Sequence, residues 1–420
     1  MSDADQGAPA GRAGGVLALL FLVYLLNYLD RALIFILLSP IKAELRLSEL
    51  QLALLGSTSF VLFYTTLGLP FGRLADRVSR PRMIAAGLFA WSLFSGLTGL
   101  MHSFTGLFVC RMCVGIGEAT LGPAALSLLS DLYPSRTRAT ASALFSAGIP
   151  LGAGIALFLG GLIGQRLGWR WAFYLLGFPG VLFSLLVLTL REPRRGAHEP
   201  AAPGGPAGFM PGLAQILGQR TVVLLLLGYS FSSLAGSALS LWIPSYLVQV
   251  FKVPLATVGR YTGACAALGG LLGVVGGGVL ADRLQARAAG GRLLFTALLA
   301  LLCAPLWLLL LRAQSVRSVL IPFALLMALG LAWLGPAAAD MQDLVAPRHR
   351  GLGIGVYFFV VNVLASGVGQ PIIGAISDRL HVGAEPWRMR QSLLVCPAAA
   401  LLSAALLLGA RASRRARAAS

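Results

Sequence analysis

Three acidic residues lie inside long apolar segments, where an ionised side chain is costly. Of the 15 Asp and Glu residues, Asp30 and Glu118 stand clearly inside such segments, and Asp340 stands near the end of another. A carboxylate at the centre of a hydrocarbon layer costs about 3 kcal/mol unless it is paired, protonated or hydrated. We therefore expect these side chains to exchange protons or to hold a charged ligand.

Asp30 belongs to a short polar motif, Asn27-Tyr28-Leu29-Asp30-Arg31. In a helix, Asn27 lies one turn from both Asp30 and Arg31, so one polar stripe can face a cavity. Burial disfavours the charged carboxylate and the neighbouring arginine favours it, so the arrival of a ligand could tip the balance. We interpret Asp30 as a titratable site next to a cation, and the alternative is an ion pair that only fixes helix packing.

Glu118 ends a second motif, Arg111-Met-Cys-Val-Gly115-Ile-Gly117-Glu118. Seven residues make nearly two helical turns, so Arg111 and Glu118 share a face about 10 Å apart along the axis. Gly115 and Gly117 remove side-chain bulk and permit a close helix contact. We expect a buried pair between Glu118 and Arg31 or Arg111, with a role in proton coupling or gating. A purely structural pair is the alternative.

Other patterns that could carry chemistry are absent from the sequence. The four histidines have no metal-ligand spacing. Cys110 and Cys113 stand in an apolar run with no second pair or histidine nearby to complete a metal site. Since no nucleophile triad or phosphate-binding loop is present either, the sequence predicts no metal, no cofactor and no enzymatic activity.

The composition predicts the elements that must position these residues. The 420 residues are 57% hydrophobic and only 11% charged, against about 25% charged in a typical soluble domain. Apolar runs of nearly 20 residues recur along the chain, and each can cross a hydrocarbon core about 30 Å thick as a helix. The expected fold is an all-α membrane protein with twelve transmembrane helices in two six-helix bundles. The expected helices are 16–38, 50–71, 83–101, 104–130, 139–165, 171–190, 221–248, 256–280, 293–311, 318–340, 352–377 and 391–410.

Two loop motifs recur at the same positions in both halves of the chain, which indicates duplication. The first motif is Gly72-Arg-Leu-Ala-Asp76-Arg77 after the second expected helix, and it recurs as Gly278-Val-Leu-Ala-Asp282-Arg283 after the eighth. The other motif is Asp131-Leu-Tyr-Pro134 after the fourth expected helix, and it recurs as Asp343-Leu-Val-Ala-Pro347 after the tenth. Duplicated halves place a binding site at their interface. The expected organisation is a tail at 1–15, a bundle at 16–190, a Pro- and Gly-rich linker at 191–219, a bundle at 220–410 and a basic tail at 411–420.

The basic residues predict the orientation. The formal net charge is +18, and the arginines gather in short segments between apolar runs, as in cytoplasmic loops. Both termini should then be cytoplasmic, in the inner (plasma) membrane of a bacterium, with membrane lipids as neighbours. Segment 378–390 is also basic yet falls outside. Nucleic acid is excluded as a partner because no soluble basic domain is present, and a monomer is expected.

The motifs resemble those of a known family, the major facilitator superfamily. Residues 72–82 are similar to its signature loop between helices two and three, and residues 111–119 to its fourth-helix motif. Within that superfamily the chain resembles the bacterial Spinster-type members, through residues 27–31, 241–244 and 371–379.

The resemblance implies alternating access by two rocking bundles, with uniport or proton-linked transport of lysolipids or related amphiphilic or anionic molecules. Asp30, Arg31 and Glu118 would line the cavity of the N-terminal half. Arg31 would hold an anionic head group, while Asp76 and Arg77 would latch the inward side.

Three questions stay open at this point. Tyr24, Tyr28, Trp242 and Tyr357 either line the apolar part of the site or serve only packing. A proton-driven drug exporter or an organic-anion symporter is the first rival function. A non-transporting membrane sensor or enzyme is the second, although the sequence has no catalytic cluster and no room for a soluble sensor domain.

Overall fold

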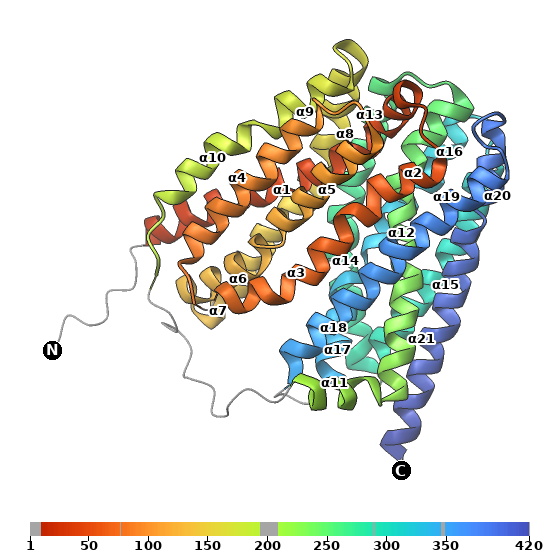
Figure 1. Ribbon diagram of the computed structural model, residues 1–420. Helices are drawn as coiled ribbons and strands as arrows, with labels where there is room; N and C mark the ends of the chain where they lie inside the picture. The colour runs from red at the N-terminus through yellow and green to blue at the C-terminus, as the bar shows by residue number, and fades with distance from the viewer. Residues whose placement is uncertain (1–9, 76, 194–208, 289, 346–348, 420) are drawn as a thin grey trace.

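The computed structural model describes residues 10–75, 77–193, 209–288, 290–345 and 349–419 (Figure 1). These ranges contain helices and no strands. The first half holds α1 (Ala10–Leu45), α2 (Glu49–Ala53), α3 (Ser59–Ala75), α4 (Arg80–Thr98), α5 (Phe104–Glu118), α6 (Leu121–Leu132), α7 (Ser135–Ser146), α8 (Gly148–Arg166), α9 (Trp169–Gly177) and α10 (Pro179–Leu188).

The second half holds α11 (Phe209–Leu217), α12 (Arg220–Phe251), α13 (Leu255–Ala264), α14 (Gly270–Arg287), α15 (Gly291–Arg312), α16 (Val316–Leu331), α17 (Leu334–Leu344), α18 (Arg350–Asn362), α19 (Gln370–Arg379), α20 (Met389–Ser392) and α21 (Val395–Ala419).

Within the described residues, eleven helical stretches are long and apolar enough to cross a membrane. The expected third span, α4, is not among them, because it begins with Arg80 and Arg82 and is less apolar. It has 19 residues and packs against α5 and α10 inside the first half, in the place of the missing span. The expected two-bundle fold is confirmed, and α4 occupies the position expected for the third of the twelve spans.

Several expected helices are broken near their middle. A proline in the first turn of α6, α10 and α17 (Pro123, Pro179 and Pro336) lacks the N–H that would continue the preceding helix. Three other spans contain a π-helical segment, at Leu54–Thr58, Cys265–Gly269 and Val363–Gly369. These wider turns free backbone groups for other partners.

The expected tails and linker are partly helical. The first helix begins at Ala10, inside the expected tail, and α21 runs to Ala419 through the basic tail. In the expected linker, α11 covers Phe209–Leu217, while 194–208 lies outside the described residues. The apolar pattern of α11 is too short to distinguish this helix from a loop by composition alone.

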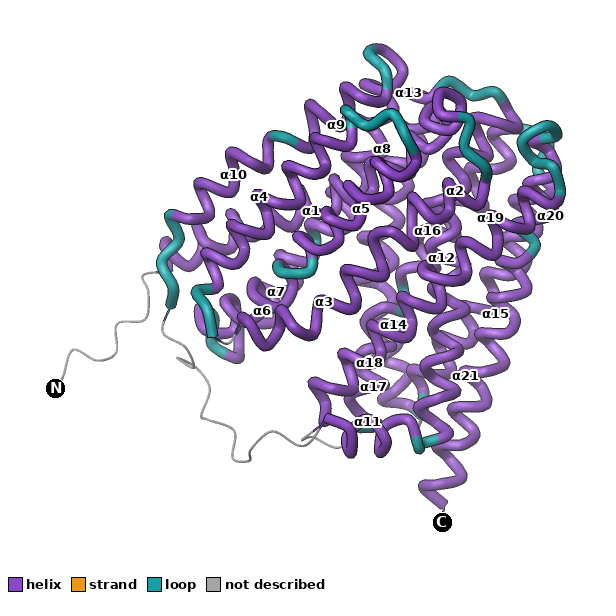
Figure 2. The backbone as a smooth tube through the Cα atoms, in the orientation of Figure 1, coloured by secondary structure: helices purple, strands orange, loops and turns teal. Residues whose placement is uncertain are grey.

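The loops gather at two ends of the molecule (Figure 2). We call the end that holds the start of α1, the loop before α4 and the chain's C-terminus the terminal end, and the opposite end the far end. The halves contact each other through α1 with α12, α8 with α13, and α2 with α19. Gly161 and Gly259 make the α8–α13 contact possible, since a Cβ on Gly259 would lie 2.4 Å from the Leu157 carbonyl oxygen.

Candidate functional site

A buried ion pair joins α1 to α5 at the centre of the first half. The Nε and Nη2 groups of Arg31 donate to Oε2 of Glu118 at 3.1 and 2.9 Å. The Glu118 side chain is fully buried, whereas that of Arg31 is 19% exposed. Of the two arginines expected as partners of Glu118, the structure selects Arg31.

Aromatic rings enclose the guanidinium of Arg31. Its central carbon lies 4.4 Å from the ring centre of Phe60, 4.5 Å from Tyr64 and 4.6 Å from Tyr28. Tyr24 packs edge-on against Tyr28 with ring centres 5.3 Å apart. Such faces attract a cation by about 0.5–2 kcal/mol each, more when water is excluded. The aromatic cage therefore fixes the guanidinium, and one of its rings also takes a hydrogen bond, which Nη1 of Arg31 donates to the Tyr28 hydroxyl at 3.4 Å.

Several polar atoms around this pair keep unused hydrogen-bonding capacity. Both Arg31 groups converge on one oxygen, so Oε1 of Glu118 makes no hydrogen bond within the described part of the chain, and the same holds for Nε and Nη2 of Arg111. Leaving a buried polar atom unsatisfied costs about 1–3 kcal/mol. The pair therefore leaves one acceptor on Glu118 and two donors on Arg111 without partners among the described residues.

Asp30 points to another side of α1. Its carboxylate accepts a hydrogen bond from Ser95 of α4 at 2.7 Å, and Arg111 donates to its backbone carbonyl at 3.4 Å. Asp30 and Asn27 are 2% and 1% exposed. The expected single stripe facing a cavity is therefore wrong in part: Arg31 has an exposed face, but Asp30 and Asn27 are buried inside the first half.

Gly115 and Gly117 allow α5 to approach its neighbours closely, as expected. A Cβ on Gly115 would lie 2.7 Å from the carbonyl oxygen of Phe60, and one on Gly117 would lie 2.9 Å from the backbone nitrogen of Trp91. These contacts bring α3 and α4 against α5 and so place Phe60 and Ser95 around the motif residues.

The predicted loop motifs fall at the terminal end. Asp76 lies outside the described residues, and the side chains of Arg77 and Arg283 are exposed. Gly72 is in loose contact, since a Cβ there would meet Pro123 only at 4.0 Å. Asp282 pairs with Arg292, whose Nη2 lies 2.9 Å from its Oδ1.

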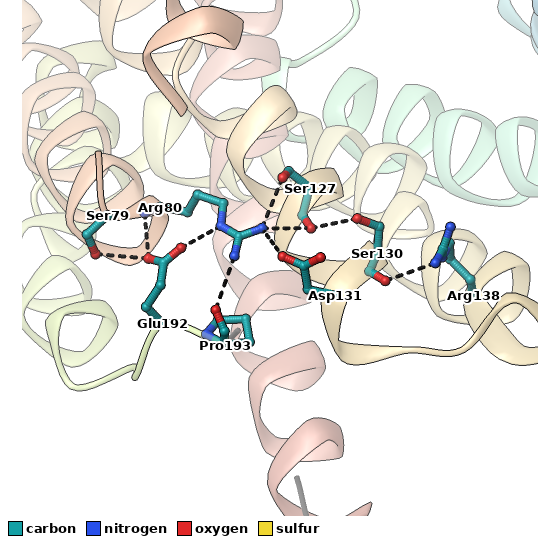
Figure 3. Close-up of polar contacts among 8 residues, drawn as sticks. All are labelled: Ser79, Arg80, Ser127, Ser130, Asp131, Arg138, Glu192 and Pro193. Carbon is teal, nitrogen blue, oxygen red and sulfur yellow. Dashed lines mark hydrogen bonds and ion pairs between the residues drawn. The ribbon is translucent and has the colours of Figure 1, made fainter. Parts of the chain in front are cut away.

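Arg80 organises a polar cluster at the terminal end of the first half (Figure 3). Its side chain is 2% exposed, and it bonds to Asp131 at 2.5 Å and to Glu192 at 2.6 Å. It also donates to the Ser127 carbonyl at 3.0 Å. The cluster ties together the start of α4, the end of α6 and the segment after α10.

The second half repeats this arrangement. Arg292, at the start of α15, donates to Asp282 and Asp343, each at 3.0 Å. The repeated Asp131 and Asp343 of the sequence thus each bind an arginine that begins a helix. The pairing of these arginines with Asp131 and Asp343 was not predicted, although each arginine stands near the start of the third span of its half.

Asp340 is also buried in the second half. It is 0% exposed, accepts a hydrogen bond from the Tyr229 hydroxyl at 3.1 Å, and lies 3.8 Å from Nη1 of Arg414. Of the other aromatic candidates, Tyr357 is buried near Tyr229, and Trp242 is buried with its indole N–H donating to Gln370 at 2.8 Å. Both side chains are buried in hydrophobic clusters, and the cluster around Trp242 contains residues of both halves.

The two halves are joined at the far end by a carboxylate on a helix terminus. Asp378 of α19 accepts hydrogen bonds from the first two backbone N–H groups of α2, Glu49 at 2.7 Å and Leu50 at 2.9 Å. Ser57 and Thr58 donate to carbonyls of Ser366 and Gly367 at 2.5 and 3.0 Å. At the terminal end the two halves diverge (Figure 1).

Known proteins resemble the chain over nearly its whole length. An MFS-type efflux pump of Mycolicibacterium smegmatis is 31% identical over 96% of this chain and 93% of its own. Protein spinster homolog 1 of Homo sapiens is 28% identical over 96% of this chain and 81% of its own. The crystal structure of a bacterial homologue of the human lysosomal transporter Spinster, inward-facing and unoccupied, matches with a TM-score of 0.81 and 25% identity over 97% of each chain.

The family model of the Major Facilitator Superfamily matches residues 20–369. The repeated loops, the two bundles and the buried charges on α1 and α5 fall within or beside that range. The chain therefore belongs to the Major Facilitator Superfamily and is a multi-pass membrane transporter, Spinster-like in sequence and fold, rather than an enzyme.

Proposed function

We propose that the protein moves an amphiphilic or anionic small molecule, lysolipid-like in character, by proton-linked alternating access. The observation that carries this proposal is the Arg31–Glu118 pair, with a caged, partly exposed cation and a buried carboxylate that keeps one oxygen unbonded. A proton on Glu118 would remove its charge and release Arg31 to hold an anionic head group. Arrival of the anion would in turn favour the protonated carboxylate, which couples the two ligands.

The conformation supports a cycle in which the halves rock about this site. Contacts between the halves seal the far end, and the matching solved structure is described as inward-facing. With the terminal end on the cytoplasmic side, the described state is closed to the outside. The opposite state would require the Asp378 contact to break.

Variants of the two carboxylates test proton coupling. In proteoliposomes with an imposed pH gradient, we expect uptake of lysophosphatidylglycerol by Glu118→Gln to fall to the rate seen without a gradient, because glutamine cannot exchange a proton. Asp30→Asn should also lose gradient dependence, while both variants still bind the lipid in the absence of a gradient. Gradient-driven uptake that is unchanged in both variants would remove the proposed role.

Labelling of introduced cysteines tests the orientation. Val78 lies at the terminal end and Gly383 at the far end, both exposed. In a variant whose five native cysteines are replaced by alanine, Val78→Cys should react in intact cells only with membrane-permeant reagents, and Gly383→Cys also with impermeant ones. The reverse pattern would invert the topology and place both termini outside.

Export of drugs is a second candidate function, favoured by the similarity to the mycobacterial efflux pump. A broad exporter accepts cations, and a caged arginine repels them. If the protein exports drugs, transport of a cationic dye should not depend on Arg31. If it carries anionic lipids, lipid transport should depend on Arg31.

A further inference from the structure

A groove of about 620 Å³ lies in the first half, apart from the interface between the halves. One wall is formed by α3 through Phe71 and Leu74, and the other by α4 through residues 79–90. The floor is the junction of α5 and α6, at Gly117 and Thr120. In Figure 1, α5 lies between α3 and α4, which agrees with this arrangement.

Small residues on α4 leave the groove open. Gly87 lies so close to the floor that a Cβ there would meet the Thr120 hydroxyl at 1.9 Å. Ala86 and Ala90 also line the groove, and Ala86 is exposed. Gly87 packs tightly on the floor, and the short side chains of Ala86 and Ala90 leave the space over it open, which gives an apolar channel. The volume of this channel falls within the range of about 300–1,000 Å³ typical of ligand sites.

The depth of the groove matches one leaflet of a bilayer. Ser79, at the terminal end, and Ala90 are eleven residues apart, which is about 16 Å along a helix. Half of a hydrocarbon core about 30 Å thick is about 15 Å. An acyl chain of one leaflet therefore fits along the groove without leaving its layer.

A cation stands at the mouth of the groove. Arg82 lines it in the first turn of α4 and is exposed, and no hydrogen bond or ion pair to the described residues is found for its side chain. The nearby carboxylate of Glu192 is already bonded to Arg80 and Ser79. Basic pockets between membrane helices at the level of the head groups favour anionic lipids.

We propose that this groove holds one acyl chain of an anionic phospholipid, with the lipid phosphate paired to Arg82. The site is distinct from the transport site at Arg31 and does not depend on the proposed substrate. Its lining comes from the first half alone, so the lipid can stay bound while the two halves move.

Lipid binding measured by native mass spectrometry of the purified protein tests the proposal. With added phosphatidylglycerol or phosphatidylcholine, we expect the wild type to bind the anionic lipid about fivefold more tightly. Arg82→Gln should lower the affinity for phosphatidylglycerol about fivefold and leave phosphatidylcholine unchanged. Ala86→Trp should weaken both lipids by filling the channel.

Arg220→Gln is the matched control. Arg220 is an exposed arginine at the terminal end of the second half and should leave binding unchanged when replaced. The thermal unfolding midpoint of Ala86→Trp shows whether that variant is folded, and Arg82→Gln decides the question if it is not. An affinity of Arg82→Gln for phosphatidylglycerol equal to that of the wild type would overturn the proposal. A dimer of the wild type in the same spectra that is lost in Ala86→Trp would also overturn it, because the groove would then bind a second copy of the chain.

Discussion

Replacement of Arg31 with glutamine is expected to lower gradient-driven uptake of lysophosphatidylglycerol by about 100-fold. The variant removes the cation that faces the site and leaves the Glu118 carboxylate buried without its partner. Loss of one member of a buried, hydrogen-bonded charge pair costs about 2–5 kcal/mol, or roughly 30- to 5,000-fold in an equilibrium constant. Uptake into proteoliposomes at fixed protein content measures the effect.

A double variant separates transport from structure. Arg31→Gln alone should lower the thermal unfolding midpoint, since an unpaired buried charge is destabilising. Adding Glu118→Gln removes that charge and should restore the midpoint, but not uptake. Recovery of uptake in the double variant would show that the pair only holds the helices together.

The single variant Arg31→Gln also distinguishes the two candidate functions, lipid transport and drug export. A carrier of anionic lipids should lose its activity with Arg31, whereas a drug exporter should continue to move a cationic dye such as ethidium. Arg31→Lys is a useful intermediate, because lysine keeps the charge but loses the planar group that packs among three rings.

The sequence predicts the spans well because lipid sets a simple rule: nearly 20 consecutive apolar residues for each crossing. It also places Asp30 and Glu118 inside them. It cannot assign the partner of Glu118, since Arg31 is 87 positions away and Arg111 is on the same helix. Only the packing of α1 against α5 decides between them.

The side chains of Asp30 and Arg31 point in different directions because of helix geometry, although the two residues are adjacent in the sequence motif. Neighbouring residues in an α-helix are turned by about 100°, so Asp30 faces Ser95 on α4 when Arg31 faces Glu118 on α5. Phe60 and Tyr64 of the cage were missed, although their spacing of four places both rings on one face of the second span. The helix breaks and the π-helical segments could not be predicted from composition, because they depend on which backbone groups find hydrogen-bond partners on neighbouring helices.

Segment 378–390 is an exception to the charge rule in the proposed orientation, where the far end faces outside. Its arginines lie at the far end, against the expected bias for the cytoplasmic side. Arg390 donates to the Tyr246 hydroxyl at 3.0 Å and to the Ala313 carbonyl at 2.9 Å, while Arg388 pairs with Glu385 at 2.9 Å. These bonds give Arg388 and Arg390 a structural role at the far end.

Replacement of Asp378 with asparagine is expected to shift the protein toward a state that is open at the far end. Both carboxylate oxygens now accept backbone N–H groups at the start of α2, where the helix dipole also favours a negative charge. Asparagine keeps one acceptor oxygen, and its NH₂ group would face a donor. Hydrogen bonds to a charged group are worth about 1.5–3 kcal/mol, so the ratio of open to closed molecules should rise about tenfold or more.

Distances between two spin labels at the far end measure this shift. Leu167 in the first half and Gly383 in the second are both exposed, and cysteines at these positions carry the labels in a cysteine-free background. In Asp378→Asn the long-distance population should grow. Glu385→Gln is the matched control, because Glu385 lies in the same region but bonds within the second half, to Arg388. An unchanged distance distribution in Asp378→Asn would mean that the packing of α8 on α13, with its glycine contacts, holds the far end closed without help from the carboxylate.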